Sequence, residues 1–205
     1  MARLGTLAGV IVVGLALASP VAVAIHVRAQ TPNFHIVRDG VLYRSGQMSL
    51  AGLKETIHDL GIRTIVNFRD GSQPADRAEE AFCQAAGIRF VRIPPMSWDG
   101  MRGSAEIDAG VDRFLAVMND PKNYPVLVHC MAGIHRTGAY CAIYRMEREG
   151  WSNERAIAEM KAHGYVNFDE EADIRGYLGT YRPGVALSRV AGHRALTRPG
   201  SPAQP

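Results

Sequence analysis

Residues 125–138 read PVLVHCMAGIHRTG, and the arrangement of the whole chain can be worked out from them. The apolar run PVLVH has the continuous hydrophobic character of a strand that is covered on both faces, as in a parallel sheet. After a short turn that contains Gly133, the spacing of apolar residues predicts a helix from about Thr137 to Glu149. A strand that passes through a tight turn into a helix is typical of an α/β fold.

The flanking sequence alternates strand and helix patterns in the same way. Asp39-Gly40 is a hairpin signal inside residues 34–45, and Ser49 and Pro74 are typical of helix starts. Further strands are predicted at 62–68 and 88–93. Further helices are predicted at 50–60, 74–86, from a cap at Ser104 to about 118, at 153–163 and from about 169. We therefore expect a single α/β domain whose central, mostly parallel sheet of about four to five strands is flanked by helices.

The two ends of the chain differ from its middle. Residues 4–25 carry no charged side chain and are nearly long enough to span a bilayer, but Pro20 interrupts them and AVA at 22–24 fits a signal-peptidase site. Residues 1–25 are therefore expected to be an export signal or, alternatively, an N-terminal membrane anchor. Either places the folded domain, residues 30–182, in the periplasm or outside the cell. Residues 183–205 are expected to be a disordered basic tail.

Composition and charge exclude several classes of function. The net charge of +3 is small and no basic stripe is interleaved with aromatic residues, so no nucleic-acid partner is expected. The three cysteines, Cys83, Cys130 and Cys141, form no CxxC pair or Cys/His cluster, so neither a metal site nor a disulfide framework is predicted. Cys83 and Cys141 are expected in the core, and Cys141 is alternatively a resolving thiol for Cys130.

The turn that follows Val128 is suited to binding an anion. Between a strand and a helix N-terminus, successive backbone N–H groups turn inward and the helix dipole adds positive charge. Gly133 permits a backbone conformation that a side chain would obstruct, and the planar fork of Arg136 matches two phosphate oxygens. The same field favours the thiolate form of Cys130, which is a nucleophile, and Thr137 can donate a hydrogen bond to the departing sulfur.

Other polar residues have more open interpretations. His129 is expected to order the loop by hydrogen bonding rather than to transfer protons. Arg44, Arg69 and Arg92 stand near predicted strand ends, where each either lines a phosphate pocket or forms a surface ion pair.

The residues around the turn resemble a known family. His129-Cys130, five intervening residues and Arg136-Thr137 match the HCx5R[S/T] signature of the cysteine-dependent protein phosphatases. VLYRSGQ at residues 41–47 and NFRD at 67–70 are similar to segments of the small atypical dual-specificity phosphatases of plant, fungal and bacterial type. The likeness covers about residues 34–180.

The resemblance implies a chemistry and a set of site residues. The thiolate of Cys130 attacks phosphorus, and water then hydrolyses the phosphocysteine without a metal or any other cofactor. Arg136, Thr137 and His129 belong to the catalytic set. The substrate phosphate is bound by the loop residues Met131, Ala132, Gly133, Ile134, His135 and Arg136.

The mechanism also needs an acid that protonates the leaving oxygen. In the family this is an aspartate on a loop about thirty residues before the cysteine, and Asp99 in SWDG stands at that distance from Cys130. No proline separates Trp98 from Asp99, which departs from the family pattern. Glu106, Asp108 or the lack of a dedicated acid remain alternatives.

The sequence thus predicts a metal-independent cysteine phosphatase that hydrolyses phosphomonoesters. Protein phosphotyrosine is the first choice of substrate, with dual specificity open and inositol polyphosphates or pyrophosphates as the alternative. An arsenate reductase-like redox enzyme and a non-catalytic phosphate-recognition module are two further hypotheses; the first needs a resolving thiol close to Cys130. The expected partners are a phosphorylated protein or a small phosphorylated substrate and, through residues 4–25, a membrane.

Overall fold

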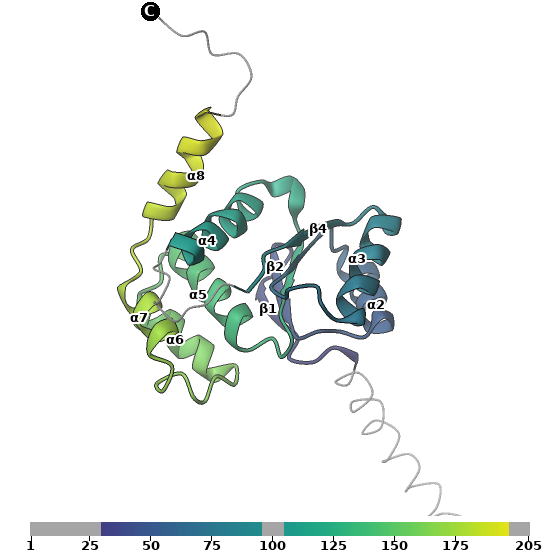
Figure 1. The fold of residues 1–205 in the computed structure, drawn as a ribbon, viewed down its shortest axis with the longest axis horizontal. Coiled ribbons are helices and arrows are strands. Elements are labelled where there is room, and N and C mark those ends of the chain that lie inside the picture. Colours follow the sequence, from purple (N-terminus) through teal and green to yellow (C-terminus); the bar gives the residue numbers. More distant parts are fainter. Residues whose placement is uncertain (1–29, 96–104, 197–205) are drawn as a thin grey trace, which may run out of the picture.

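The computed structural model describes residues 30–95 and 105–196, and these form a central sheet with helices on both faces (Figure 1). The elements in chain order are β1 (His35–Arg38), β2 (Leu42–Ser45), α2 (Leu50–Leu60), β3 (Thr64–Asn67), α3 (Pro74–Ala86), β4 (Arg89–Arg92), α4 (Ala105–Met118), the 3-10 turn η1 (Pro121–Asn123), β5 (Val126–His129), α5 (His135–Glu149), α6 (Asn153–Ala162), α7 (Ala172–Thr180) and α8 (Val185–Leu196). The expected export segment and Asp99 lie outside the described residues.

The sheet has the strand order β1-β2-β5-β3-β4. The hairpin partners β1 and β2 are antiparallel, whereas β2, β5, β3 and β4 run parallel. His129 at the end of β5 is level with Ser45 on one neighbour and with Asn67 on the other. The chain segments that follow these three strands therefore leave the sheet at the same carboxyl edge, and the predicted α/β fold with a mostly parallel sheet is confirmed.

Alternation along the strands divides the core into two layers. On one face, Ile65 and Leu127 pack with residues of α2 and α3, including Leu53 and Cys83. On the other face, a larger cluster built on Val66 and Val128 takes in residues of α4, α5, α6, α7 and α8. Figure 1 shows α2 and α3 on one side of the sheet and α4, α5 and α6 on the other.

The helix ends follow the local sequence signals. The Ser49 hydroxyl caps α2 by accepting a hydrogen bond from the Gly52 N–H at 3.0 Å. Gly61 and Gly87 end α2 and α3 in the left-handed conformation, with φ of 62° and 69°. The helix predicted from about Thr137 begins slightly earlier, at His135, because the last residues of the turn already have helical geometry.

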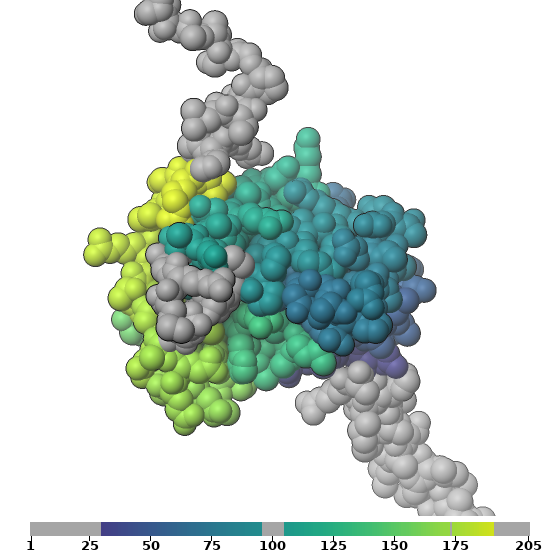
Figure 2. Space-filling view, viewed as in Figure 1, coloured from purple at the N-terminus to yellow at the C-terminus, as the bar shows by residue number. Residues whose placement is uncertain are grey.

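The expectation of a disordered tail is wrong for residues 185–196, which form α8. Ala186 is buried, and Leu187 and Val190 pack against the core. Arg189 Nε lies 2.9 Å from Asp112 Oδ2 on α4, and Figure 2 shows α8 in yellow against the body of the molecule. The apolar positions are few, so this helix depends on a partner helix far away in the sequence and not on its own composition.

No helix within residues 30–95 and 105–196 is long and apolar enough to span a membrane. The same ranges contain no group of His, Cys, Asp and Glu side chains that could hold a metal ion.

Candidate active site

Cys130 stands at the head of the turn that joins β5 to α5, and only 5% of its surface is exposed. Gly133 in the same turn has φ of 73°, a conformation that residues with a side chain rarely adopt. A Cβ atom on Gly133 would lie 2.4 Å from Gly46 N and 2.5 Å from Ser45 O. The turn can therefore press against the end of β2 only because position 133 is glycine.

The N–H and C=O groups of this turn differ in their hydrogen bonding. None of the N–H groups of residues 131–136 has a hydrogen-bond acceptor among the described residues. The carbonyl groups, by contrast, accept hydrogen bonds from donors outside the turn: Met131 O from Gln47 N (2.9 Å), Ala132 O from Asn33 Nδ2 (2.7 Å) and Gly133 O from Arg44 Nη2 (2.7 Å). Carbonyls that are turned outward and N–H groups left unpaired make a cradle for an anion, and α5 adds its N-terminal partial charge. We call residues 130–136 the phosphate loop.

Arg136 and Thr137 lie in the first turn of α5, directly after the loop. The Arg136 guanidinium is partly exposed, with Nη1 3.4 Å from Phe68 O. The Thr137 side chain is fully buried, and its hydroxyl has no hydrogen-bond partner among the described residues. The first group is free to meet a ligand, and the second is a donor available to an acceptor that arrives in the loop.

His129 anchors the loop to the α3 side of the sheet. Its Nε2 lies 2.9 Å from Glu79 Oε1, and its Nδ1 lies 3.4 Å from the carbonyl oxygen of Cys130. Asn67 Nδ2 donates to the second oxygen of Glu79 at 2.7 Å. Burial raises the pKa of Glu79, but contacts from His129, Asn67 and Gln47 outweigh it and hold the pKa below its usual value. The predicted ordering role of His129 fits this geometry.

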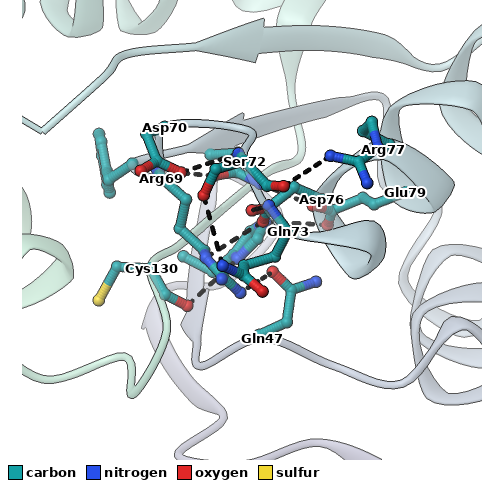
Figure 3. Close-up of polar contacts among 12 residues, drawn as sticks. Gln47, Arg69, Asp70, Ser72, Gln73, Asp76, Arg77, Glu79 and Cys130 are labelled. Carbon is teal, nitrogen blue, oxygen red and sulfur yellow. Dashed lines mark hydrogen bonds and ion pairs between the residues drawn. The ribbon is translucent and has the colours of Figure 1, made fainter.

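Two of the three strand-end arginines belong to ion pairs on this side. Arg69 Nε lies 3.1 Å from Oδ1 of the buried Asp76, and Arg69 Nη1 donates to Gln47 Oε1 at 3.1 Å. Arg92 Nη2 lies 2.8 Å from Glu80 Oε2. Figure 3 shows the polar network that joins Gln47, Arg69, Asp76 and Glu79. In the same view the carbonyl oxygen of Cys130 faces this network and the sulfur points away from it.

The third arginine, Arg44, is buried on the opposite face of the sheet. Its position in β2 follows Leu42 and Tyr43, so its side chain shares the α5 face with Leu42. The sequence pattern predicts Arg44 near a strand end, but it contains no sign that Arg44 supports Gly133, which is 89 residues further along the chain. Glu79 was missed for the same reason: helix periodicity marks it as one polar residue among several on α3.

The structure does not favour Asp108 as the acid. Its Oδ1 accepts a hydrogen bond from the Tyr177 hydroxyl at 2.7 Å and lies 3.4 Å from Arg189 Nη2. It lines a cavity of about 250 Å³ whose other residues come from α7, α8 and the link between them. No residue of the phosphate loop lines that cavity. Glu106 is in the first turn of α4, and Asp99 lies outside the described residues.

The other two cysteines are core residues, as predicted. Burial raises the pKa of the Cys83 thiol to about 12 and that of the Cys141 thiol to about 11. Both stay protonated at neutral pH, which makes either one a poor attacking thiol in a disulfide exchange.

Comparisons with known proteins agree with this geometry. A family model described as "DSP-PTPase phosphatase fused to NAD+ Kinase" matches residues 21–176. The dual specificity protein phosphatase TpbA of Pseudomonas aeruginosa is 26% identical over 173 residues, which are 83% of this chain and 74% of TpbA. The inositol diphosphatase DSP1 of Oryza sativa subsp. japonica is 34% identical over 118 residues, 55% of this chain and 49% of DSP1.

Solved structures show the same fold. The core catalytic domain of the PP-IP phosphatase SIW14 from S. cerevisiae superposes with a TM-score of 0.63 at 20% identity, over 80% of this chain and 94% of that chain. The crystal structure of P. aeruginosa TpbA gives a TM-score of 0.58 at 24% identity, over 82% and 96% of the two chains. The resemblance read from residues 128–138 is thus confirmed over most of the chain, and the protein belongs to the DSP-PTPase family of metal-independent cysteine phosphatases.

Proposed function

We propose that this protein hydrolyses aryl phosphomonoesters, with phosphotyrosine in a protein as the preferred substrate, through a phosphocysteine at Cys130. The observation that carries the proposal is the phosphate loop, in which every N–H group from 131 to 136 lacks an acceptor among the described residues while three carbonyls are bonded outward. Such a loop stabilises a dianion and a thiolate next to each other.

The proposed reaction has two steps. First, the Cys130 thiolate attacks phosphorus, an S–P bond forms, and the P–O bond to the leaving group breaks while Asp99 protonates the leaving oxygen. Second, water attacks phosphorus and gives its proton to Asp99, the S–P bond breaks, and inorganic phosphate leaves with the thiolate restored. Arg136 holds two phosphoryl oxygens through its fork, and the Thr137 hydroxyl donates to the sulfur as it departs.

The surroundings of the loop support an aryl substrate over a polyanion. Met131 in the loop is 64% exposed and Val166 is 85% exposed. The turn that carries Val166 packs on the loop, since the His135 ring lies 4.4 Å from the Tyr165 ring. An apolar rim of this kind suits the ring of a phosphotyrosine.

The cations near the loop also favour an aryl substrate over a polyanion. Arg69, Arg92 and Lys161 are each paired with a carboxylate at 2.7–3.1 Å. Among the described residues of the loop, this leaves Arg136 as the one permanently charged cation, and its fork is already assigned to the reacting phosphate. The similarity to inositol diphosphatase DSP1 nevertheless makes inositol pyrophosphates the second candidate.

The test compares substrates and three variants. The wild type is expected to release phosphate from para-nitrophenyl phosphate and from a phosphotyrosine peptide faster than from inositol hexakisphosphate, and Cys130→Ser is expected to release none. Hydrolysis that survives in Cys130→Ser would rule out the phosphocysteine mechanism. Met131→Lys is expected to shift the preference toward the inositol phosphate, whereas Val185→Lys, at another exposed apolar position on α8, leaves the ratio unchanged.

Arsenate reduction is less well supported than hydrolysis. It would require a thiol that attacks Cys130, and both Cys83 and Cys141 are buried with raised pKa values. An assay of arsenate-dependent oxidation of a dithiol reductant is therefore expected to show no turnover above the buffer.

We further propose that residues 1–25 export the protein, either as a cleaved signal or as an anchor. The support is their sequence, since residues 4–25 are uncharged and end in a small-residue motif. Fusion of residues 1–30 to a reporter that is active only outside the cytoplasm is expected to give reporter activity. The mass of the mature protein then distinguishes cleavage from retention.

A further inference from the structure

Arg44 is a buried cation without a counter-ion among the described residues. Only 1% of its surface is exposed, and its position opposite Val128 places it at the centre of the sheet. Nη2 donates to the carbonyl oxygen of Gly133 at 2.7 Å, while Nε has no hydrogen-bond partner among those residues. No carboxylate of the described chain lies at ion-pair distance from it, in contrast to Arg69 and Arg92.

The titratable groups around Arg44 do not neutralise it. Burial, and after it the charge of Arg44, lowers the pKa of both His35 and His163, so these rings are neutral at pH 7. Burial keeps the nearby Cys141 protonated. Glu159, the acid on α6 that acts on His163 and Cys141, is bound by Arg145 at 2.7 Å. An uncompensated charge in a protein interior is costly and persists only where something else balances it.

The carbonyl that Arg44 holds belongs to the residue whose orientation decides the shape of the loop. Gly133 has the least restricted backbone in the loop, with φ of 73°. If its peptide group rotated, its oxygen would face the bound anion and repel it. The hydrogen bond from Arg44 fixes the oxygen on the outer side.

We propose that Arg44 is a positioning residue of the phosphate loop: it locks the Gly133 carbonyl outward, and its own charge is balanced by the anion that the loop holds. The proposal rests on the proposed phosphatase function, because it takes residues 130–136 as an anion site. Arg44 acts through Gly133 and does not contact the substrate. A bound phosphate or an ionised Cys130 is the negative partner that the described chain does not supply.

Two substitutions separate the two parts of this role. Arg44→Lys keeps the charge but loses the planar fork, and Arg44→Gln keeps an N–H donor for Gly133 but loses the charge. Arg89→Gln is the control for loss of a strand arginine, because the Arg89 side chain also makes one hydrogen bond, to Asn123 Oδ1 at 2.6 Å, but the residue is exposed and stands at the amino edge of the sheet.

The measurements use the full chain and include two probes of the loop beside the activity assay. The first is the increase in Tm produced by inorganic phosphate, and the second is the rate of alkylation of Cys130 by iodoacetate as a function of pH. Arg44→Gln is expected to weaken phosphate binding by about tenfold or more and to move the alkylation profile to higher pH. Its kcat/KM for para-nitrophenyl phosphate is expected to fall on the order of 10- to 100-fold. Arg44→Lys falls between it and the wild type, and Arg89→Gln matches the wild type.

A purely structural role predicts a different pattern. The test applies to Arg44 variants that fold, as judged by circular dichroism. The proposal is overturned if such variants keep both the phosphate-induced increase in Tm and the alkylation profile of the wild type, whatever their own stability. If Arg44→Gln does not fold, Arg44→Lys decides in the same way. Failure of the proposed function is distinct, since then the wild type itself would neither bind phosphate nor hydrolyse para-nitrophenyl phosphate.

Discussion

The phosphate loop is supported from both faces of the sheet, and the two supports differ in kind. On the face of α2 and α3, His129, Glu79 and Asn67 contact one another, and each charge there has a partner of opposite sign or a hydrogen bond. On the face of α5 and α6, Arg44 and Thr137 are equally buried, yet each keeps a polar atom without a partner among the described residues.

The side of the loop that faces α2 and α3 therefore has its polar partners in the free protein, whereas the side that faces α5 and α6 does not. A network whose members satisfy one another holds its geometry with or without a ligand. Buried polar groups that lack partners, such as Arg44 and Thr137, reduce the stability of the free protein. Interactions that such groups gain when an anion binds would favour the anion-bound state over the free state. The paired side thus fixes the position of the loop, and the unpaired side makes the loop respond to what it binds.

The largest effect is expected at Gly133, whose carbonyl Arg44 holds and whose backbone lies against the end of β2. In Gly133→Ala the new Cβ would overlap backbone atoms of Ser45 and Gly46 at 2.4–2.5 Å, so the loop must shift away from β2. We expect kcat/KM for para-nitrophenyl phosphate to fall on the order of 100-fold or more. The control is Gly150→Ala at the end of α5, where φ is also positive (65°) but nothing lies within 4 Å. Equal activity losses in the two variants would show that backbone strain, and not the contact with β2, is responsible.

Disrupting the network of His129, Glu79 and Asn67 should lower the free energy of unfolding by an amount that depends on pH. Glu79→Gln is expected to lower the free energy of unfolding at pH 7 by about 1–3 kcal/mol, because His129 loses its buried partner. The folded state depresses the pKa of Glu79, so its contribution is complete above the unfolded value near 4.5 and is lost as the pH falls through the lower folded value. Urea unfolding at pH 7 and at pH 3–4 should therefore show the gap between the variant and the wild type closing in acid.

The neighbouring acid provides the control for Glu79. Glu80→Gln removes a half-exposed partner of Arg92 and is expected to cost less than about 1 kcal/mol. A gap for Glu79→Gln that stays constant down to pH 3 would contradict the assignment of an ionised, buried Glu79.

On the unpaired side, activity and stability should separate. Thr137→Val removes a buried hydroxyl without a partner, so we expect the stability to stay within about 0.5 kcal/mol of the wild type or to increase. Hydrolysis of the phosphocysteine is expected to slow by about tenfold, because the departing sulfur loses a donor. Thr64→Val removes another buried hydroxyl without a partner, at the amino end of β3, and should leave the rate unchanged. A burst of nitrophenol followed by slow turnover, seen in Thr137→Val only, is the signature to look for.

The smallest effect is expected far from both supports. Arg189→Met on α8 breaks an ion pair with Asp112 that is about one-third exposed, and we expect a loss below about 1 kcal/mol with kcat/KM unchanged. Hydrogen exchange of residues 185–196 measures whether α8 frays in this variant. A change in phosphate affinity would mean that α8 is coupled to the loop, which the present contacts do not indicate.

Local signals were sufficient for much of this molecule. The strand, glycine turn and helix around Cys130 and the capped ends of α2 and α3 depend on residues close together in the chain, and all were predicted. What the sequence could not reveal depends on distant partners. Arg44 meets Gly133, Glu79 meets His129, and Arg189 meets Asp112 only after the sheet and its helices have assembled.

The outward hydrogen bonds of the phosphate loop have a consequence for where the enzyme is vulnerable. Their donors, Asn33, Arg44 and Gln47, all come from one short stretch at the start of the folded domain, although the loop itself is made some ninety residues later. A cut ahead of residue 30 would leave these donors in the chain. A single cut inside 33–47 would weaken the hydrogen bonds that hold the carbonyls of the phosphate loop. We would expect it to reduce the activity of Cys130, although Cys130 itself lies far from the cut in the sequence.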